Sequence, residues 1–259
     1  MTNSRVPGSL AGGTGPQRRE AVFGLPSGSP PIDASQAVAA ACRGALSGLS
    51  SGGTEAAAKA SRRRQVQAGR AARSPAERAR RDALRANCFF GAFDAWPAEA
   101  PRVVACYAAV PPEPATEAIL AGLVQRGVAV LLPVVGPAGG GWRDPDWAYW
   151  DGSERLRSAA GAIPQPTAPP LGAAALQAAS LVVMPGLAGD RSGRRLGAGG
   201  GWYDRALRHS QPKAPRWLLL NADEVDAFLP AEPWDEPVDA LITEAKLLIC
   251  SPPRPRPPS

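Results

Sequence analysis

Residues 102–135, RVVACYAAVPPEPATEAILAGLVQRGVAVLLPVV, determine the expected fold. The run 102–110 is β-branched and aromatic and is bounded by prolines, which is typical of a short buried strand. A helical apolar period then runs from Thr116, which is placed to cap the helix, to Gly127, which ends it. Residues 128–135 form a second apolar run without polar alternation, as in strands covered on both faces. This order predicts a right-handed βαβ unit with parallel strands.

The same alternation continues toward the carboxyl end of the chain. It comprises a short helix at 170–179, a strand at 180–186, a helix start at 201–210, a strand at 216–222 and a final strand at 238–243. Residues 136–152, which are rich in Gly, Trp and Asp, predict a loop or a twisted hairpin. We therefore expect an α/β domain over residues 55–250, with a parallel or mixed central sheet and helices on both faces in a Rossmann-like arrangement.

An Ala- and Arg-rich segment precedes this alternation. Ala and Arg are good helix formers, and the segment predicts a first helix over residues 55–72. The sequence SPAER then reads as an N-cap at Ser74, a proline at the first helical position and Glu77 at the third. A second helix is expected over residues 75–87.

The two ends of the chain differ in composition from its middle. The 28 Gly and 29 Pro residues gather at the ends and in a few loops, so residues 1–54 predict a disordered or low-complexity extension and 251–259 a Pro-rich tail. The extension is loosely similar to a transit peptide, and organelle import stays open beside a simple extension or an upstream start. No apolar run approaches the about 20 residues that span a bilayer. We expect a cytoplasmic protein without membrane contact.

Most of the formal net charge of +6 is local. Residues 55–85 hold ten Lys or Arg against three acids, a net of +7, which leaves the rest of the chain at about −1. Such a run is a solvated helix face in one interpretation and a phosphate or nucleic-acid contact in the other.

Cysteine and histidine chemistry is not indicated by the sequence. The four cysteines, at positions 42, 88, 106 and 250, include no C-x-x-C pair and have no neighbouring histidine, which argues against a zinc or thioredoxin-type site. His209 is the single histidine, so a Ser-His-Asp or Cys-His mechanism would rest on it alone.

The stretch RRLGAGGGWYDRAL, residues 194–207, carries the strongest local signal for a ligand. It follows the carboxyl end of the strand expected at 180–186, where open α/β sheets bind their ligands. Its glycines match neither the dinucleotide fingerprint nor a Walker motif. Closely spaced glycines before a helix nevertheless allow backbone N–H groups to surround an anion. A plain mobile loop is the alternative.

The longer string LVVMPGLAGDRSGRRLGAGGGWYDRAL, residues 181–207, closely resembles the signature of the 5-formyltetrahydrofolate cyclo-ligase family, also called methenyltetrahydrofolate synthetase. Four further stretches resemble family motifs in the same order: KASRR at 59–63, SPAER at 74–78, PPEPAT at 111–116 and WDEPVDALIT at 234–243. The resemblance implies a Rossmann-like fold of the cyclo-ligase type. It also implies ATP-driven closure of 5-formyltetrahydrofolate to 5,10-methenyltetrahydrofolate, a ligase reaction that forms a C–N bond and releases ADP and phosphate.

The family motifs assign roles to residues of this chain. Lys59 and Arg195 are the implied catalytic residues. The implied ATP-binding residues are Lys59, Arg63, Arg195, Leu196, Gly197, Ala198, Gly199, Gly200, Gly201, Trp202 and Tyr203. The implied substrate-binding residues are Glu113, Ala198, Gly199, Gly200, Gly201 and Trp202. Asp204 and Asp235 are the implied ligands of Mg²⁺, which in proteins takes one or two carboxylates beside water and phosphate oxygens.

The sequence departs from the usual family pattern at Gly189, Ala198, Trp202 and Trp234, and these departures concern the folate end of the site. Tyr107 and Trp202 offer flat faces to the pterin or aminobenzoyl ring, or else belong to the core. Simpler roles also remain open for the charged residues: a solvated face for Lys59 and Arg63, a helix start for Asp204, and ordinary loop positions for Glu113 and Asp235.

The implied ligands are 5-formyltetrahydrofolate, ATP and Mg²⁺, bound by a monomer without nucleic acid. Two other hypotheses stay open. The first is a domain of this family that has lost catalysis and binds a partner such as RNA through the basic segment. The second is an ATP-dependent enzyme that acts on another formyl or amide compound.

Overall fold

The computed structural model describes residues 53–95, 103–135, 144–152, 156–158 and 163–251. All of them lie in the compact unit Ile32–Ser259; the second unit, Met1–Pro31, falls outside the described residues. The extension predicted over 1–54 and the tail predicted over 251–259 fall almost entirely outside as well and stay predictions. None of the described helices is both long and apolar enough to cross a membrane.

Within the described residues, seven strands form the large sheet in the order β12-β11-β9-β6-β1-β2-β3. The strands are β1 Val103–Ala105, β2 Ala129–Pro133, β3 Trp147–Trp150, β6 Leu181–Pro185, β9 Arg216–Leu219, β11 Ala240–Ile242 and β12 Leu247–Ile249. The inner pairings are parallel, and both edge strands, β3 and β12, pair antiparallel to their neighbours. The predicted mixed sheet and its βαβ unit are confirmed.

Two edge strands of the sheet differ from the elements that the sequence predicts. Strand β11, predicted as the final strand, is followed by β12, which folds back on it after the turn at Thr243. Residues 147–150, predicted as part of a loop or twisted hairpin, form β3 against β2. The antiparallel partner at each end covers strand edges that would otherwise expose unpaired N–H and C=O groups.

Alternating side chains of the sheet fill two separate cores. Leu181 and Val183 of β6 belong to one core, and Val182 and Met184 of the same strand belong to the other. This alternation is the period of two that a strand imposes. Apolar side chains on both faces explain why the sequence shows continuous apolar runs here instead of polar alternation.

Helices α3 (Pro75–Asp94) and α4 (Glu117–Gln125) supply the first core. Ser74 caps α3 as predicted, because its side chain accepts the N–H of Glu77 at 3.1 Å. The helix runs seven residues beyond the predicted end at Asn87, since Phe89 and Phe93 pack into the core and prolong its apolar face.

Thr116 occupies the N-cap position of α4, as predicted, but its side chain does not play the predicted capping role. Thr116 precedes α4 but makes no side-chain capping bond; its hydroxyl instead accepts the N–H of Ala109 at 3.0 Å. The buried hydroxyl therefore satisfies the segment that leaves β1 rather than the start of the helix.

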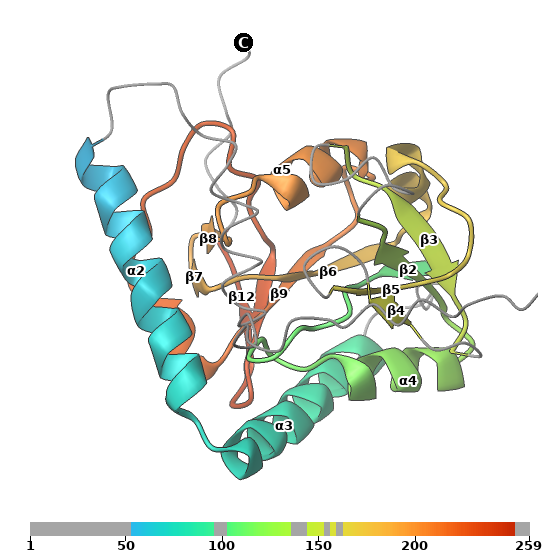
Figure 1. Ribbon diagram of the computed structural model, residues 1–259, viewed down its shortest axis with the longest axis horizontal. Helices are drawn as coiled ribbons and strands as arrows, with labels where there is room; N and C mark the ends of the chain where they lie inside the picture. The colour runs from blue at the N-terminus through green and yellow to red at the C-terminus, as the bar shows by residue number, and fades with distance from the viewer. Residues whose placement is uncertain (1–52, 96–102, 136–143, 153–155, 159–162, 252–259) are drawn as a thin grey trace, which may run out of the picture. The chain divides into compact units, whose positions relative to one another are not determined.

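The second core is covered by short helices. They are η3 (Ala173–Ala178), α5 (Trp202–Ala206) and η4 (Leu207–His209), of which η3 and η4 are 3₁₀ helices. Helices thus cover both faces of the large sheet, as the sequence predicts (Figure 1).

A small sheet beside the carboxyl ends of the large one supports the candidate site. Its order is β10-β7-β8, with β7 at Ala188–Asp190, β8 at Arg195–Leu196 and β10 at Val225–Asp226. The 3₁₀ helix η5 (Ala222–Glu224) leads into β10. A separate pair joins β4 (Arg157–Ser158) to β5 (Pro164–Gln165).

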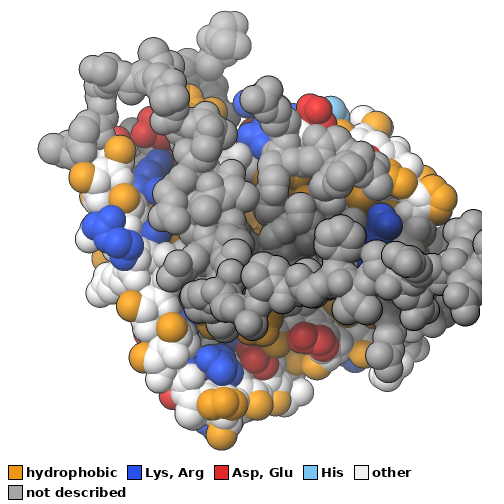
Figure 2. Space-filling model, in the orientation of Figure 1, with side chains coloured by type: hydrophobic (Ala, Val, Ile, Leu, Met, Phe, Trp, Pro, Cys, Tyr) orange, Lys and Arg blue, Asp and Glu red, His pale blue; other side chains and the backbone are white. Residues whose placement is uncertain are grey.

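Helix α2 (Gly53–Ala72) runs alongside this small sheet in Figure 1. Val66 is the one buried apolar side chain that the described part of α2 contributes. The predicted helix over 55–72 is confirmed, but its attachment to the domain is mainly polar. Figure 2 shows Lys and Arg side chains along the edge of the molecule that α2 forms.

Candidate active site

The glycine turn, which we define as residues 197–201, connects β8 to α5. Gly199 has φ +106° and Gly201 has φ +63°, values that L-residues with a side chain rarely adopt. A Cβ added at Gly199 would lie 3.6 Å from the guanidinium carbon of Arg63. Glycine therefore lets the turn take its shape, and Arg63 of α2 lies within ordinary van der Waals distance of it. Helix α5 has five residues, so its dipole is short.

Two cations of α2 reach this turn and the segment beside it. Arg63 Nε donates to the carbonyl of Gly197 at 2.9 Å. Lys59 Nζ donates to Asp235 Oδ2 at 3.0 Å and lies 3.9 Å from Glu232 Oε1. Lys59 and Arg63 are one helical turn apart and share a face, as their spacing predicts. The structure thus brings Lys59, Arg63 and the glycine turn together.

The two predicted metal ligands lie on adjoining segments. Asp204 Oδ1 accepts Arg195 Nη2 at 2.6 Å and the backbone N–H of Glu236 at 3.2 Å. Asp235, the residue before Glu236, accepts the N–H of Glu232 at 2.8 Å. Both carboxylates are therefore held near the turn by contacts to α2 and β8.

These carboxylates fit Mg²⁺ by their chemistry. No group of three or more His, Cys, Asp or Glu that could hold a metal occurs among the described residues. Mg²⁺ does not need such a cage, because it keeps several waters and shares phosphate oxygens with its nucleotide. Asp204 and Asp235 supply the hard oxygen donors that this mode of binding uses.

Three aromatic residues beside the turn form one cluster. The ring centroids of Trp202 and Tyr203 lie 4.9 Å apart, and those of Trp147 and Trp202 lie 5.2 Å apart. Trp202 is 6% exposed and belongs to the second core, so most of its ring is core packing.

Several buried polar atoms in this cluster lack partners. Among the described residues, the buried side-chain N and O atoms without a hydrogen bond are Trp147 Nε1, Arg195 Nε, Trp202 Nε1 and Tyr203 Oη. Burying a polar group without a partner is costly, so such groups are rare in native proteins. Arg195, Trp202 and Tyr203 lie within or beside the glycine turn and α5 in the chain, and Trp147 packs against Trp202.

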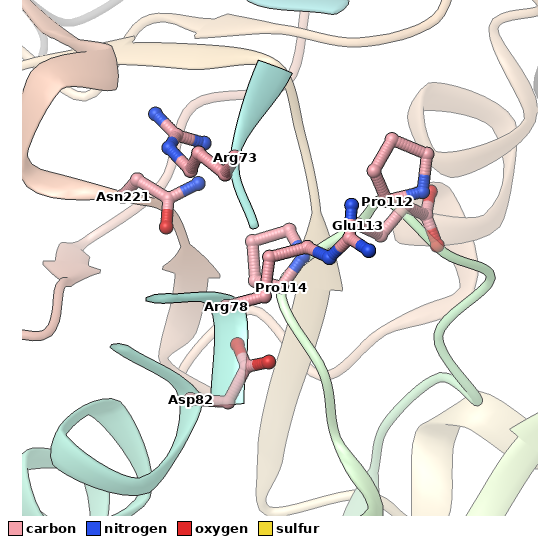
Figure 3. Close-up of a pocket in the computed structure, with 7 residues that line it drawn as sticks. All are labelled: Arg73, Arg78, Asp82, Pro112, Glu113, Pro114 and Asn221. Atoms are coloured by element: carbon pink, nitrogen blue, oxygen red, sulfur yellow. The ribbon is translucent and has the colours of Figure 1, made fainter. Parts of the chain in front are cut away.

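Glu113 lies near the other end of α2. It follows the cis peptide between Pro111 and Pro112, and its Oε2 accepts the N–H of Val110 at 2.9 Å. Figure 3 shows it at a small cleft between the α2–α3 junction, residues 112–114 and Asn221. Burial raises the pKa of Glu113, although the hydrogen bond from Val110 and the charge of Arg70 act in the opposite direction.

Tyr107 belongs to the first core. It is 4% exposed, and its hydroxyl donates to the carbonyl of Pro114 at 3.3 Å, which fastens the loop that carries Glu113. Burial raises the pKa of Tyr107 well above its ordinary value, and Glu113 adds to the effect. The core interpretation of Tyr107 is the one that the structure supports.

The basic segment is largely paired within the chain. Side chains of Arg62, Arg70, Arg73, Arg81 and Arg85 form ion pairs with carboxylates that include Asp223, Glu224, Asp226 and Glu244. Sequence reasoning singled out neither these arginines nor their acidic partners. The spacing of Arg62, Arg70 and Arg73 in the sequence could have indicated that these side chains point to one side of the molecule. No sequence pattern indicated which distant carboxylates they would contact.

A model of the 5-formyltetrahydrofolate cyclo-ligase family matches residues 55–244 of this chain. The chain belongs to this family. Among curated relatives, the 5-formyltetrahydrofolate cyclo-ligase of Mycolicibacterium smegmatis is 35% identical over 150 residues, which cover 57% of this chain and 76% of that protein. The mitochondrial 5-formyltetrahydrofolate cyclo-ligase of Arabidopsis thaliana is 39% identical over 82 residues, 28% of this chain and 30% of that protein.

Solved structures support the cyclo-ligase fold. The 5,10-methenyltetrahydrofolate synthetase of Aquifex aeolicus aligns with a TM-score of 0.61 at 23% identity, over 77% of this chain and 96% of that one. The synthetase of Mycoplasma pneumoniae aligns with a TM-score of 0.56 at 18% identity, over 72% and 98% of the two chains.

One departure from the usual cyclo-ligase pattern has a structural explanation. A Cβ added at Gly189 would lie 2.9 Å from methyl carbons of Leu218 and Leu241 and 3.1 Å from one of Leu220. The position faces closely packed leucines of the second core, so the missing aromatic side chain bears on packing there rather than on the glycine turn.

Proposed function

We propose that this cyclo-ligase family member converts 5-formyltetrahydrofolate to 5,10-methenyltetrahydrofolate at the expense of ATP. The observation that carries the residue assignments is the meeting of Lys59, Arg63 and Arg195 with the glycine turn and with Asp204 and Asp235. Cations, backbone N–H groups and hard carboxylates are the parts that phosphoryl transfer from a magnesium nucleotide uses.

The reaction overcomes a poor electrophile and a poor leaving group. The formyl oxygen attacks the γ-phosphorus of ATP, the bond to the β-phosphate oxygen breaks, and ADP departs. N10 of the folate then attacks the carbon that bears the phosphorylated oxygen, the C–O bond breaks with loss of phosphate, and N10 gives up its proton. The new C–N bond closes the methenyl ring. The protein mainly positions the reactants and neutralises charge.

Each cation has a defined place in this proposal. Lys59 and Arg63 would contact the phosphates from α2, and Arg195 from β8, with the backbone of residues 196–203 around them. Lys59 and Arg195 are the proposed catalytic residues, as the family motifs imply, and each forms an ion pair with one of the two carboxylates. A nucleotide phosphate would compete with Asp235 for Lys59.

Mg²⁺ would be held by Asp204 and Asp235. When bound, the ion neutralises phosphate charge during transfer. The contacts of Asp204 with Arg195 and with the N–H of Glu236 orient its carboxylate toward the turn from two directions.

The folate end is proposed to involve Glu113, residues 198–201 and Trp202. The polar atoms of Trp202 and Tyr203 that lack partners within the described residues support a ligand beside the turn. The pterin is rich in hydrogen-bond donors, which Glu113 can accept in its ionised form. Cytoplasmic location, a monomeric state and the absence of a nucleic-acid partner belong to the same proposal.

A cyclisation assay tests the proposal directly. Purified protein receives 5-formyltetrahydrofolate, ATP and MgCl₂ in neutral buffer, and the absorbance of the methenyl product and the release of phosphate are followed together. Equal rates of both signals are expected. Absence of an ATP-dependent signal would overturn the proposal, while turnover of another formyl or amide compound alone would favour the related enzyme.

The pairing of the basic segment weighs against the RNA-binding alternative. Arginines that already hold carboxylates at 2.5 to 2.8 Å do not offer an open cationic surface to a phosphate backbone. Salt-sensitive RNA binding without ATP turnover is the result that would favour that alternative instead.

A further inference from the structure

The attachment of α2 to the small sheet is mainly ionic. One face of α2 carries, in order, Lys59, Arg62, Arg63, Val66 and Arg70, and Arg73 directly follows the helix. Val66 is the only buried apolar residue in the described part of α2, and it belongs to none of the apolar clusters that the described residues form. Apolar packing fixes a helix weakly when so little area is buried. The orientation of α2 therefore depends on its polar contacts.

The deepest of these contacts anchors the carboxyl-terminal half of α2. Arg70 binds Glu224 in a bidentate pair at 2.8 and 2.7 Å and also donates to the carbonyl of Gly186 at 2.7 Å. The two side chains are 3% and 2% exposed. Gly186 lies between β6 and β7, and Glu224 directly precedes β10. One arginine therefore holds this half of the helix to the segments that lead into two strands of the small sheet.

A second bidentate pair lies nearer the proposed phosphate site. Arg62 Nε donates to Asp226 Oδ2 at 2.8 Å, and Arg62 Nη2 donates to Asp226 Oδ1 at 2.6 Å. Asp226 lies on β10, one edge of the small sheet, while Arg63 binds the residue that follows β8, the other edge. Neighbouring residues of α2 thus hold opposite edges of the same sheet.

From this arrangement we propose that Arg62 and Asp226 are a positioning pair for nucleotide binding, which holds α2 where Lys59 and Arg63 reach the phosphates. The proposal rests on the phosphate contacts assigned above. Arg62 itself is engaged elsewhere, because Nη1 donates to Gln65 at 3.1 Å while Nε and Nη2 serve Asp226. Paired guanidinium and carboxylate groups fix geometry as well as energy, which suits them to this task.

The chain offers a control pair, which is more exposed to solvent than Arg62 and Asp226. Arg126 and Asp94 form a bidentate pair of the same kind, at 3.0 and 2.8 Å, between the end of α4 and the end of α3. Neither residue belongs to α2 or the small sheet. Removing this pair tests the general effect of losing an Arg–Asp contact without disturbing the proposed phosphate site.

The experiment compares Arg62→Ala, Asp226→Ala, Arg126→Ala and the exchanged pair Arg62→Asp/Asp226→Arg. Calorimetric titration with a non-hydrolysable ATP analogue in MgCl₂ gives the nucleotide Kd, and steady-state assays give KM for ATP and for 5-formyltetrahydrofolate. For Arg62→Ala and Asp226→Ala we expect Kd and KM for ATP to rise about tenfold, as loss of a charged hydrogen-bond pair allows. The folate KM and the Arg126→Ala variant should change less than about twofold, and the exchanged pair should recover most of the loss.

Three results would overturn the positioning role. They are a nucleotide Kd in Arg62→Ala equal to that in Arg126→Ala, a parallel rise of both KM values, or an exchanged pair as weak as the single variants. The last result is also the one expected if Arg62 touched phosphate directly. Failure of the wild-type protein to bind the nucleotide would instead count against the proposed function, so the two failures are distinguishable. Asp226→Asn, which keeps the side-chain shape, replaces Asp226→Ala if the latter fails to fold.

Discussion

Lys59 Nζ lies 3.0 Å from Asp235 Oδ2, although 176 positions separate the two residues in the chain. The first described helix and one of the last loops thus meet at the glycine turn. A cation proposed for phosphate and a carboxylate proposed for the metal are neighbours there, so changes to either should affect the same step.

Lys59→Ala should lower kcat/KM for ATP by at least about 100-fold, because a cation aimed at a transferring phosphoryl group is lost. Its ion pair is partly exposed to solvent, so stability should fall by no more than about 1 kcal/mol. Initial rates and thermal unfolding of the same preparation measure both effects. The exposed Lys213→Ala variant is the control, and wild-type turnover in Lys59→Ala would remove Lys59 from the catalytic set.

Asp204→Asn should raise the MgCl₂ concentration that gives half-maximal rate by about tenfold, because a neutral amide is a poorer ligand for a hard cation than a carboxylate. Addition of EDTA to the wild-type protein should stop turnover, and excess MgCl₂ should restore it. Asp94→Asn is the control at a remote Arg–Asp pair. An unchanged magnesium dependence in Asp204→Asn would contradict its role as a ligand.

Gly199→Ala should weaken ATP binding about tenfold, because a positive φ costs an L-residue on the order of 1–2 kcal/mol and any relaxation moves the turn away from Arg63. KM for ATP measures the weaker binding, and the midpoint of urea unfolding measures the conformational cost. Gly91→Ala serves as the comparison, since Gly91 lies within α3 and a Cβ there meets nothing within 4 Å. That variant should gain about 0.5–1 kcal/mol of stability, and equal behaviour of the two variants would refute the requirement for glycine in the turn.

Glu224→Gln should lower the free energy of unfolding at neutral pH. It should also make that free energy depend less on pH in the acid range. Burial raises the pKa of Glu224, but the hydrogen bond and charge of Arg70 and the hydrogen bonds from Asn221 outweigh it, so the pKa lies below the ordinary value of 4.5. A depressed carboxyl pKa contributes stability above the unfolded pKa, and this contribution is lost as the pH falls through the folded pKa.

Urea unfolding between pH 7 and pH 3 measures this effect. At neutral pH, Glu224→Gln should cost about 3–5 kcal/mol, since Arg70 stays buried without its carboxylate. The wild-type protein should lose more stability than the variant as the pH falls below about 4.5. Glu77→Gln, at a more exposed pair with Arg81, is the control and should follow the wild-type curve. Parallel curves for Glu224→Gln and wild type would show that the Glu224 carboxyl does not cause the loss of stability in acid.

The central sheet was predictable because its signals are local. Apolar strands alternating with helical periods indicated the βαβ units, and Ser74 with Glu77 marked the start of α3. Strand β12 was not predicted, because it is three residues long and follows a turn without the usual glycine or asparagine. The role of Thr116 depended on a tertiary contact with Ala109, which no helical pattern encodes.

The site was predictable in part for the same reason. Helical spacing placed Lys59 and Arg63 on one face, and the glycine pattern indicated the turn. The partners of Arg62 and Arg70 lie 164 and 154 positions away, and an ion pair between such distant residues leaves no periodic trace in the sequence. The family motifs supplied Asp235, but only the fold shows that it faces Lys59.

The polar attachment of α2 has a consequence for biosynthesis. The carboxylate partners of α2, which are Glu224, Asp226 and Asp235, are translated more than a hundred residues after the helix itself. Because a ribosome adds about 5–20 residues per second, an emerging α2 waits several seconds or more before those partners exist. The proposed nucleotide-binding surface is therefore completed late in the folding of the nascent chain, and a chain that stops before residue 224 lacks the carboxylates that hold its arginine-rich helix.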